Sequence, residues 1–137
     1  MKILFLLLLA LDQLIKRLFL FHQHFNYQNL VLVKNSGIAF GLFQNSTFFI
    51  ILLNLIIIQF IIFFRKALFY DSTLKKLAFV FILAGGFGNL IDRCLLGFVV
   101  DFIAILNFPV FNIADVYINI GIVLLFISYL RNAKKGV

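Results

Sequence analysis

The chain has 137 residues, of which 64% are hydrophobic and 20 are phenylalanine, while only 12% carry a charge. This composition excludes an ordinary soluble domain, in which about half of the residues are apolar. The formal net charge of +7 does not indicate nucleic-acid binding, because the positive residues flank apolar segments instead of forming one basic patch.

Four apolar segments have approximately the length that spans a bilayer, about 17–25 residues. They cover residues 3–21, 47–64, 77–96 and 113–130. We therefore predict an all-α membrane protein with four transmembrane helices and a small β-containing outer loop region. The chain is short enough that we expect a single domain, residues 1–137, with no room for a second.

The positive residues are divided unevenly between the two sides that four crossings would create. One side holds eight of them, Lys2, Arg65, Lys66, Lys75, Lys76, Arg131, Lys134 and Lys135. The opposite loops, 22–46 and 97–112, hold only Lys34. The positive-inside rule then predicts that both termini are cytoplasmic and that these two loops face outward.

The first segment begins like a secretory signal peptide, but no small-residue cleavage site follows, so we expect an uncleaved span. Within it Asp12 precedes Lys16 by four positions, the favourable orientation for an ion pair on a helix. We interpret this pair as structural and buried against other helices. An aspartate held by a neighbouring lysine is a poor proton shuttle.

The first outer loop contains the apolar, β-branched run 30–33, which predicts a short strand. A turn at residues 35–37 and the run 38–43 follow, and we expect this part to fold back on the outer membrane surface. In the second segment, Asn54 and Gln59 are predicted to form hydrogen bonds between helices. The charged stretch 65–76 is predicted to be a cytoplasmic loop.

The third segment carries small residues at 84–88, which allow helices to approach closely. Asn89, Asp92 and Arg93 follow on one helical face. Arg93 is either an anchor at the membrane interface or a residue that holds a substrate or orients an acid, and spacing alone leaves both open. The single Cys94 excludes an internal disulfide and is interpreted as a small apolar filler.

Two aspartates lie in apolar surroundings at the predicted outer face, Asp101 and Asp115. A carboxylate in or beside hydrocarbon costs several kcal/mol, so such residues are usually paired and functional. Asp115 has a structural alternative as a first-turn acid, and Asn112, Asp115 and Asn119 would form one polar stripe that faces inward. Two carboxylates that share one proton can act as general base and general acid on a water molecule.

Other catalytic arrangements lack their residues in this sequence. No His-Glu-x-x-His motif, no Gly-x-Ser-x-Gly motif and no phosphate-binding Gly-x-x-x-x-Gly-Lys motif occurs. Paired carboxylates are what remains, and we expect neither a metal ion nor a cofactor. The competing hypothesis is a small non-enzymatic transporter or ion-binding protein, whose inward acids bind protons or cations. Against it, the two halves share no evident repeat, and the acids gather at one end instead of at mid-membrane.

Five sequence blocks together resemble those of bacterial lipoprotein signal peptidase, also called signal peptidase II. Three of them are residues 88–93 (Gly-Asn-Leu-Ile-Asp-Arg), 97–102 (Gly-Phe-Val-Val-Asp-Phe) and 111–115 (Phe-Asn-Ile-Ala-Asp). Residues 11–16 resemble the first-helix block, and residues 35–40 the outer-loop block. The blocks occur in order and cover nearly the whole chain.

The resemblance implies a membrane aspartic endopeptidase that removes the signal peptide from diacylglyceryl-modified prolipoproteins, cutting before the lipidated cysteine. Asp101 and Asp115 match the catalytic dyad. The residues that match the substrate-binding or supporting positions are Asn89, Arg93, Asn112, Asp12, Lys16, Asn35 and Gly37. The expected location is the bacterial cytoplasmic (inner) membrane, with the active site near the outer face. We expect a monomer whose partners are the prolipoprotein substrates and membrane lipid, and no nucleic-acid partner.

Two positions depart from the family pattern. Val116 replaces a serine that often follows the second aspartate, and Phe108-Pro109 stands where Trp-Pro is common. Neither change touches a dyad position, so we expect them to affect loop packing and not the reaction.

Overall fold

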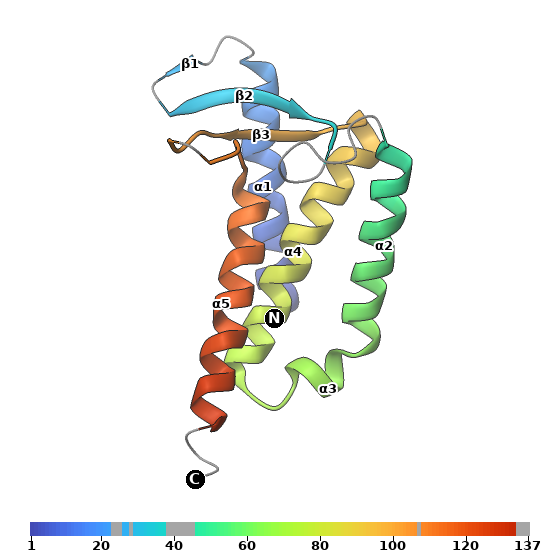
Figure 1. The fold of residues 1–137 in the computed structure, drawn as a ribbon, viewed down its shortest axis with the longest axis vertical. Coiled ribbons are helices and arrows are strands. Elements are labelled where there is room, and N and C mark those ends of the chain that lie inside the picture. Colours follow the sequence, from blue (N-terminus) through green and yellow to red (C-terminus); the bar gives the residue numbers. More distant parts are fainter. Residues whose placement is uncertain (23–25, 28, 38–45, 107, 134–137) are drawn as a thin grey trace.

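The computed structural model describes residues 1–22, 26–27, 29–37, 46–106 and 108–133. Helices and a small sheet make up this part of the chain (Figure 1). The elements in chain order are α1 (Lys2–Phe21), β1 (Asn26–Tyr27), β2 (Leu30–Asn35), α2 (Thr47–Phe63), α3 (Arg65–Phe69), α4 (Thr73–Leu96), β3 (Val99–Ile103) and α5 (Ile113–Ala133).

Helix α4 is the centre of the bundle and packs against α1, α2, α3 and α5. Its Ser72 N-cap accepts a hydrogen bond from the amide of Lys75, and its end is marked by Gly97 in the left-handed conformation. Both features are typical of helix ends, because a serine oxygen satisfies a free N–H and glycine tolerates a positive φ. The predicted helix boundaries at 77–96 are therefore extended by one turn at the start.

The small residues of α4 permit the close helix contacts that the sequence predicts. A methyl group on Gly85 would collide with the carbonyl oxygen of Ala114 on α5, and one on Gly88 would collide with the carboxylate of Asp12 on α1. Gly86 differs, since an added carbon there would meet Ile58 of α2 at an ordinary 3.5 Å. Gly85 and Gly88 thus set the spacing of three helices beside Asp12 and Ala114.

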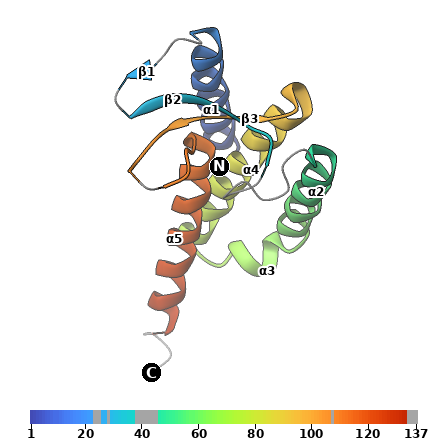
Figure 2. The same cartoon turned by 45° about the horizontal axis from the view of Figure 1, so that its top comes forward.

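The strands form an antiparallel sheet in the order β1-β2-β3, which lies across one end of the helices (Figures 1 and 2). Val33 of β2 pairs with Asp101 of β3. The ring of Phe102 stacks on Phe19 of α1 with 4.2 Å between centroids, which fixes the sheet to the helices. The chain turns that connect α2 to α3 and α3 to α4 lie at the opposite end (Figure 1).

The structure confirms helices at all four predicted segments and the predicted strand at 30–33. Two predictions were wrong in detail. Asp101 was expected on an outer loop but lies on β3, and the predicted loop 65–76 contains the short helix α3 and the first turn of α4. Local pattern missed β3 because its residues are almost all buried, so it has no alternation of polar and apolar positions. Residues 38–43 lie outside the described residues.

The two predicted interhelical hydrogen bonds of α2 are also not as expected. The amide nitrogen of Asn54 is buried and has no hydrogen-bond partner among the described residues, and Gln59 is exposed. Polar residues on an apolar helix can face a cavity as well as another helix. Asn54 is of that kind, because it lines the groove described below.

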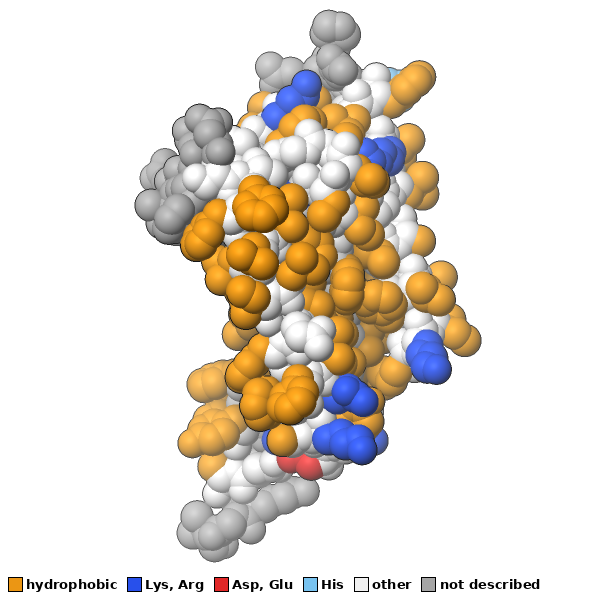
Figure 3. Space-filling view, turned by 90° about the vertical axis from the view of Figure 1, so that its right-hand side faces the viewer, with side chains coloured by type: hydrophobic (Ala, Val, Ile, Leu, Met, Phe, Trp, Pro, Cys, Tyr) orange, Lys and Arg blue, Asp and Glu red, His pale blue; other side chains and the backbone are white. Residues whose placement is uncertain are grey.

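The surface is strongly apolar. Figure 3 shows hydrophobic side chains over the middle of one face, with lysine and arginine side chains toward both its lower and its upper end. Within the described part, α4 and α5 are long and apolar enough to cross a bilayer, and α2 is a shorter apolar helix of 17 residues. A mostly helical fold with two such helices is therefore confirmed, and the arrangement with four spans stays a prediction.

Candidate active site

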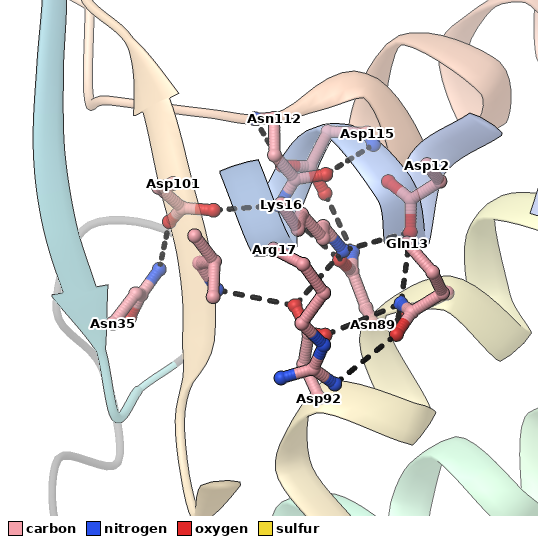
Figure 4. Close-up of polar contacts among 12 residues, drawn as sticks. Asp12, Gln13, Lys16, Arg17, Asn35, Asn89, Asp92, Asp101, Asn112 and Asp115 are labelled. Atoms are coloured by element: carbon pink, nitrogen blue, oxygen red, sulfur yellow. Dashed lines mark hydrogen bonds and ion pairs between the residues drawn. The ribbon is translucent and has the colours of Figure 1, made fainter. Parts of the chain in front are cut away.

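Asp101 is a buried carboxylate held by two neutral amides. Its side chain lies on β3, and the residue is 2% exposed. Oδ2 accepts a hydrogen bond from Asn35 Nδ2 at 2.8 Å, and Oδ1 accepts one from Asn112 Nδ2 at 2.6 Å (Figure 4). Amide donors orient the carboxylate without adding a formal positive charge, so the group keeps its ability to exchange a proton.

The register of the sheet places Asn35 beside Asp101. Asp101 pairs with Val33, so Asn35, two positions along β2, is its diagonal neighbour on the same face. The Asn35 carboxamide is oriented by its own turn, because Oδ1 accepts the amide of Gly37 at 3.0 Å and Nδ2 is left to face Asp101. Arg93 Nη2 in turn donates to the carbonyl oxygen of Gly37 at 3.0 Å. Helix α4 thus holds the turn that positions Asn35.

Asp115 lies in the first turn of α5 and forms a reciprocal cap with Asn112. The amide of Asp115 donates to Asn112 Oδ1, and the amide of Asn112 donates to Asp115 Oδ2, both at 3.1 Å. This is the capping-box arrangement, in which two free helix-end N–H groups are satisfied at once. The remaining oxygen, Asp115 Oδ1, accepts a hydrogen bond from Asn89 Nδ2 at 2.8 Å. Asp115 is therefore both a first-turn acid that caps α5, as the structural alternative predicted, and a hydrogen-bond partner of Asn89 in the site.

Asn112 connects the two aspartates. It is fully buried, and its Nδ2 donates to Asp101 and also to Asn89 Oδ1 at 3.2 Å. Figure 4 shows Asp101 and Asp115 on either side of this side chain, from β3 and α5. Because one asparagine contacts both carboxylates, a shift of either element changes the environment of both.

A second polar cluster lies behind the first and contains the predicted Asp12–Lys16 pair. Lys16 Nζ is 3.1 Å from Asp12 Oδ2 and 3.1 Å from Asp92 Oδ2, and all three side chains are fully buried. The same nitrogen donates to Asn89 Oδ1 at 2.9 Å. One cation thus balances two buried acids and also fixes the amide that contacts Asp115. Asp12 Oδ1 is buried without a hydrogen-bond partner among the described residues, so the charge of Asp12 depends on its contacts through Oδ2.

Gln13 and Asp92 complete this cluster. Gln13 Nε2 lies within 3.2 Å of Asp12 Oδ2 and Asp92 Oδ1, and within 3.1 Å of the Gly88 carbonyl oxygen. Asp92 Oδ2 accepts the amide of Val100 at 3.2 Å. Val100 directly precedes Asp101, so the cluster that ties α1 to α4 also anchors β3 next to the acid.

A groove of about 870 Å³ runs past both aspartates. Its volume is within the range of ligand sites, about 300–1,000 Å³. The polar residues that line it are Asn35, Asn54, Asn89, Arg93, Asp101, Asp115 and Asn119. Asn54 Nδ2 and Arg93 Nε are buried and have no hydrogen-bond partner among the described residues. Both residues line the groove, but these two nitrogen atoms are themselves shielded from it.

Burial raises the pKa of Asp101 to about 6, and the negative charge of Asp115 acts in the same direction. The hydrogen bonds from Asn35 and Asn112 and the charge of Lys16 act in the opposite direction, since they stabilise the ionised carboxylate. A carboxyl group with this pKa exchanges its proton near neutral pH, as general acid–base chemistry requires. Within the described part of the chain, no group of three or more His, Cys, Asp or Glu residues could hold a metal ion.

Comparison with known proteins agrees with this geometry. Residues 4–131 match the family described as signal peptidase (SPase) II. The chain belongs to the signal peptidase II family.

Relatives named lipoprotein signal peptidase are similar over most of the chain. The one from Streptococcus pneumoniae is 33% identical over 96% of this chain and 92% of its own length. The one from Microcystis aeruginosa is 45% identical over 77% of this chain and 66% of its own length. A bacterial membrane enzyme solved by the in meso method at 2.3 Å resolution superposes with a TM-score of 0.86 at 28% identity, covering 98% of this chain and 89% of that one.

Membership of the signal peptidase II family supports a protease over a transporter. The structure brings together all nine residues that the sequence analysis selected. Asn35, Asn89, Arg93, Asp101 and Asp115 line the groove. Asn112 contacts both aspartates. The carbonyl oxygen of Gly37 accepts a hydrogen bond from Arg93. Lys16 forms an ion pair with Asp12 and donates a hydrogen bond to Asn89.

Four further residues at the site were not selected from the sequence. Asn119 lines the groove and belonged to the predicted polar stripe with Asn112 and Asp115. Asp92 stood on the same helical face as Asn89 and Arg93, and that spacing was a usable signal. Gln13 lies four positions before Arg17, a helical spacing that was also a usable signal, and Arg17 Nη2 donates to Gln13 Oε1 at 3.3 Å. Asn54 was interpreted as a helix–helix contact, and only the tertiary structure places this residue in the wall of the groove. Of the two departures from the family pattern, Phe108-Pro109 lines the groove, so its change lies where a ligand would bind.

Proposed function

We propose that this chain is a single-domain aspartic endopeptidase of the signal peptidase II family that cleaves prolipoproteins before their diacylglyceryl-modified cysteine, with Asp101 and Asp115 as the catalytic dyad. One observation carries the assignment. The two carboxylates line one groove and are bridged by one buried asparagine, Asn112, with neutral amides as their side-chain partners. Neutral hydrogen-bond donors allow each carboxylate to be either ionised or protonated, so the pair can share one proton.

In the proposed reaction the ionised aspartate takes a proton from a water molecule, whose oxygen attacks the scissile carbonyl carbon. The protonated aspartate donates its proton to the carbonyl oxygen, giving a tetrahedral diol. When the diol collapses, the aspartate that is now ionised takes a proton from one diol hydroxyl, the C–N bond breaks, and the aspartate that took the water proton donates it to the departing nitrogen. Each aspartate thus serves once as acid and once as base, as a shared-proton pair allows.

Asp101 is the member that we expect to hold the shared proton once substrate is bound. Its pKa is raised to about 6 by burial, and the exclusion of water by bound substrate favours the neutral acid further. Asp115 lies at the start of α5, where the helix dipole stabilises a negative charge. Asp115 would then be the base that activates water.

The proposed location of the site is the outer face of the bacterial cytoplasmic membrane, with four spans formed by α1, α2, α4 and α5 and with both termini in the cytoplasm. Positive residues at the end opposite the sheet support this orientation. A lipid-modified substrate would then be anchored in the outer leaflet at the depth of the groove. Asn54 and Arg93 line the groove, where their side chains would lie beside such a substrate. The protein would act as a monomer.

The direct test uses a diacylglyceryl-modified prolipoprotein and the purified chain in detergent. Asp101→Asn and Asp115→Asn should each lower the cleavage rate by at least about 10³-fold, since removing one member of a catalytic unit removes the pathway. Asp71→Asn is the matched control. Its carboxylate lies at the other end of the molecule, in an exposed pair with Lys75.

The result expected is cleavage by the wild type and by Asp71→Asn, and none by either dyad variant. Cleavage that persists in Asp101→Asn or Asp115→Asn would refute the dyad. Failure of the wild type on lipidated substrate, with its fold intact by circular dichroism, would refute the proposed activity and return the ion-binding hypothesis to consideration.

A further inference from the structure

A second cavity lies at the end of the helices opposite the sheet, between the start of α1, the chain around α3 and the first half of α4. Its volume is about 670 Å³. Most of its wall is apolar and is formed by Phe5, Leu6, Tyr70, Phe79, Val80 and Leu83. No residue of the proposed dyad or of its supporting clusters contributes to this cavity, so the peptidase reaction gives it no role.

Three cations line the same cavity, Lys2, Arg65 and Lys76. They come from three different elements, so the fold and not local sequence gathers them. Arg65 donates Nη1 to the carbonyl oxygen of Ile62 at 2.8 Å, which fixes its guanidinium at the end of α2. The nearby acid, Asp71, lies 2.7 Å from Lys75 and is engaged there. Among the described residues, Lys2 and Lys76 have no acidic partner.

We propose that this cavity binds one anionic phospholipid, with its phosphate between Lys2, Arg65 and Lys76 and part of an acyl chain against the apolar wall. The proposal joins two observations. The cations without an acidic partner favour binding of an anion, and the apolar wall favours contact with hydrocarbon. A phospholipid with net negative charge carries an anionic phosphate and hydrocarbon chains on one molecule. Such lipids are present in the bilayer around a membrane enzyme. Basic pockets between helices bind lipid headgroups in this way.

A peptide or a small free anion fits less well. An acidic peptide would need donors and acceptors for its backbone, and the cavity wall around the cations is mostly apolar. A free phosphate would use the cations but leave the apolar wall in contact with water, which is unfavourable. Figure 3 shows lysine and arginine side chains next to hydrophobic ones at this end of the molecule, the pattern of a surface in contact with headgroups.

The test is native mass spectrometry of the purified full-length chain, released from detergent that contains equal amounts of phosphatidylglycerol and phosphatidylcholine with identical acyl chains. The wild type should retain one phosphatidylglycerol in preference to phosphatidylcholine. Lys2→Gln/Lys76→Gln should reduce that preference by about tenfold or more, because a cation near a headgroup contributes about fivefold in affinity. Both residues are exposed, so the double variant is expected to fold normally.

The matched control is Lys66→Gln/Arg131→Gln. Lys66 and Arg131 are exposed, on the same side of the protein and outside the cavity lining. Their replacement removes the same net charge as the replacement of Lys2 and Lys76. This control should keep the wild-type preference. An equal decrease in the two double variants would show general charge attraction and overturn the proposal. Binding of glycerol phosphate as tight as that of phosphatidylglycerol would assign the site to a free anion and overturn the lipid assignment. The readout is binding, so its outcome does not depend on the proposed peptidase activity.

Discussion

At the scale of single residues, the site separates neutral donors from charged ones. Asn35, Asn112 and Asn89 donate to the two proposed catalytic aspartates, whereas the buried ammonium of Lys16 contacts Asn89 and two other acids. The guanidinium of Arg93 lines the same groove and donates to the Gly37 carbonyl oxygen. A cation directly on Asp101 or Asp115 would hold that carboxylate ionised and prevent proton sharing. Placing the cation one asparagine away stabilises the arrangement while leaving the dyad able to exchange a proton.

Asn35→Ala should change the pH profile of cleavage. Asn35 Nδ2 stabilises ionised Asp101 and so lowers its pKa from what burial alone would cause. Without this bond the pKa rises, Asp101 keeps its proton to higher pH, and the alkaline limb of kcat/KM moves upward by about half to one pH unit. The measurement is kcat/KM between pH 5 and pH 9 for the wild type and the variant. An alkaline limb that moves downward would contradict the assignment of the shared proton to Asp101.

Lys16→Met should destabilise the fold strongly. It leaves Asp12 and Asp92 buried without their cation, and breaking such a pair costs about 3–5 kcal/mol. Thermal unfolding in detergent, followed by circular dichroism, measures the change. Lys75→Met is the control, because the Lys75–Asp71 pair is partly exposed and such pairs contribute about 0–1 kcal/mol. Equal stability of the two variants would contradict the role given to the buried cluster.

At the scale of elements, the positions of the aspartates depend on how α4 meets its neighbours. Ala114 of α5 packs its carbonyl against Gly85, and Asp115 is the next residue. Asp101 depends on the pairing of β3 with β2 and on the Asp92 contact to the Val100 amide. Helix α4 therefore contacts the carriers of both acids, and its glycines control the distance to α5.

Gly85→Ala should lower activity and stability together. The added methyl collides with the Ala114 carbonyl, so α5 must move away from α4 and take Asp115 with it. Overpacking of this kind costs about 1–3 kcal/mol. Gly86→Ala is the matched control for stability on the same helix, since its methyl finds only ordinary contact with Ile58, and alanine favours a helix by about 1 kcal/mol. Gly86 lines the groove, so this control is compared by unfolding temperature alone. The unfolding temperature should fall in Gly85→Ala and not in Gly86→Ala, and an equal fall in both would contradict the argument.

At the scale of the whole molecule, the chain has two chemically different ends. The sheet, the groove and both proposed catalytic aspartates are at one end, and the cationic cavity is at the other. An asymmetric charge distribution of this kind orients a membrane protein, because lysine and arginine are retained on the cytoplasmic side. The proposed outer location of the peptidase site follows from that asymmetry.

Single-cysteine labelling in spheroplasts tests this orientation. Cys94 is exposed, so it is first replaced by serine. Leu106→Cys places a thiol at the sheet end, where Leu106 is 98% exposed, and Lys66→Cys places one on α3 at the other end. A membrane-impermeant maleimide should label the first in intact spheroplasts and the second only after permeabilisation. The reverse pattern would contradict the proposed topology.

The sequence by itself determined the helical segments, the strand at 30–33, the family and the nine residues expected at the site. The helical segments and the strand follow from local properties such as apolar length and side-chain pattern, while the family and most of the nine residues follow from the resemblance of short sequence blocks to signal peptidase II. Asn89, Asp92 and Arg93 share a helical face, for example, because helical geometry places positions three and four apart side by side.

Only the tertiary structure decided which groups contact one another across the chain. The pairing of β3 with β2 brings Asn35 to Asp101 over 66 positions, and the packing of α1 on α4 brings Lys16 to Asn89 over 73. It also placed Asn54 in the wall of the groove and gathered Lys2, Arg65 and Lys76 around one cavity. Such contacts depend on the relative placement of elements that are distant in sequence, and local periodicity contains no information about that placement.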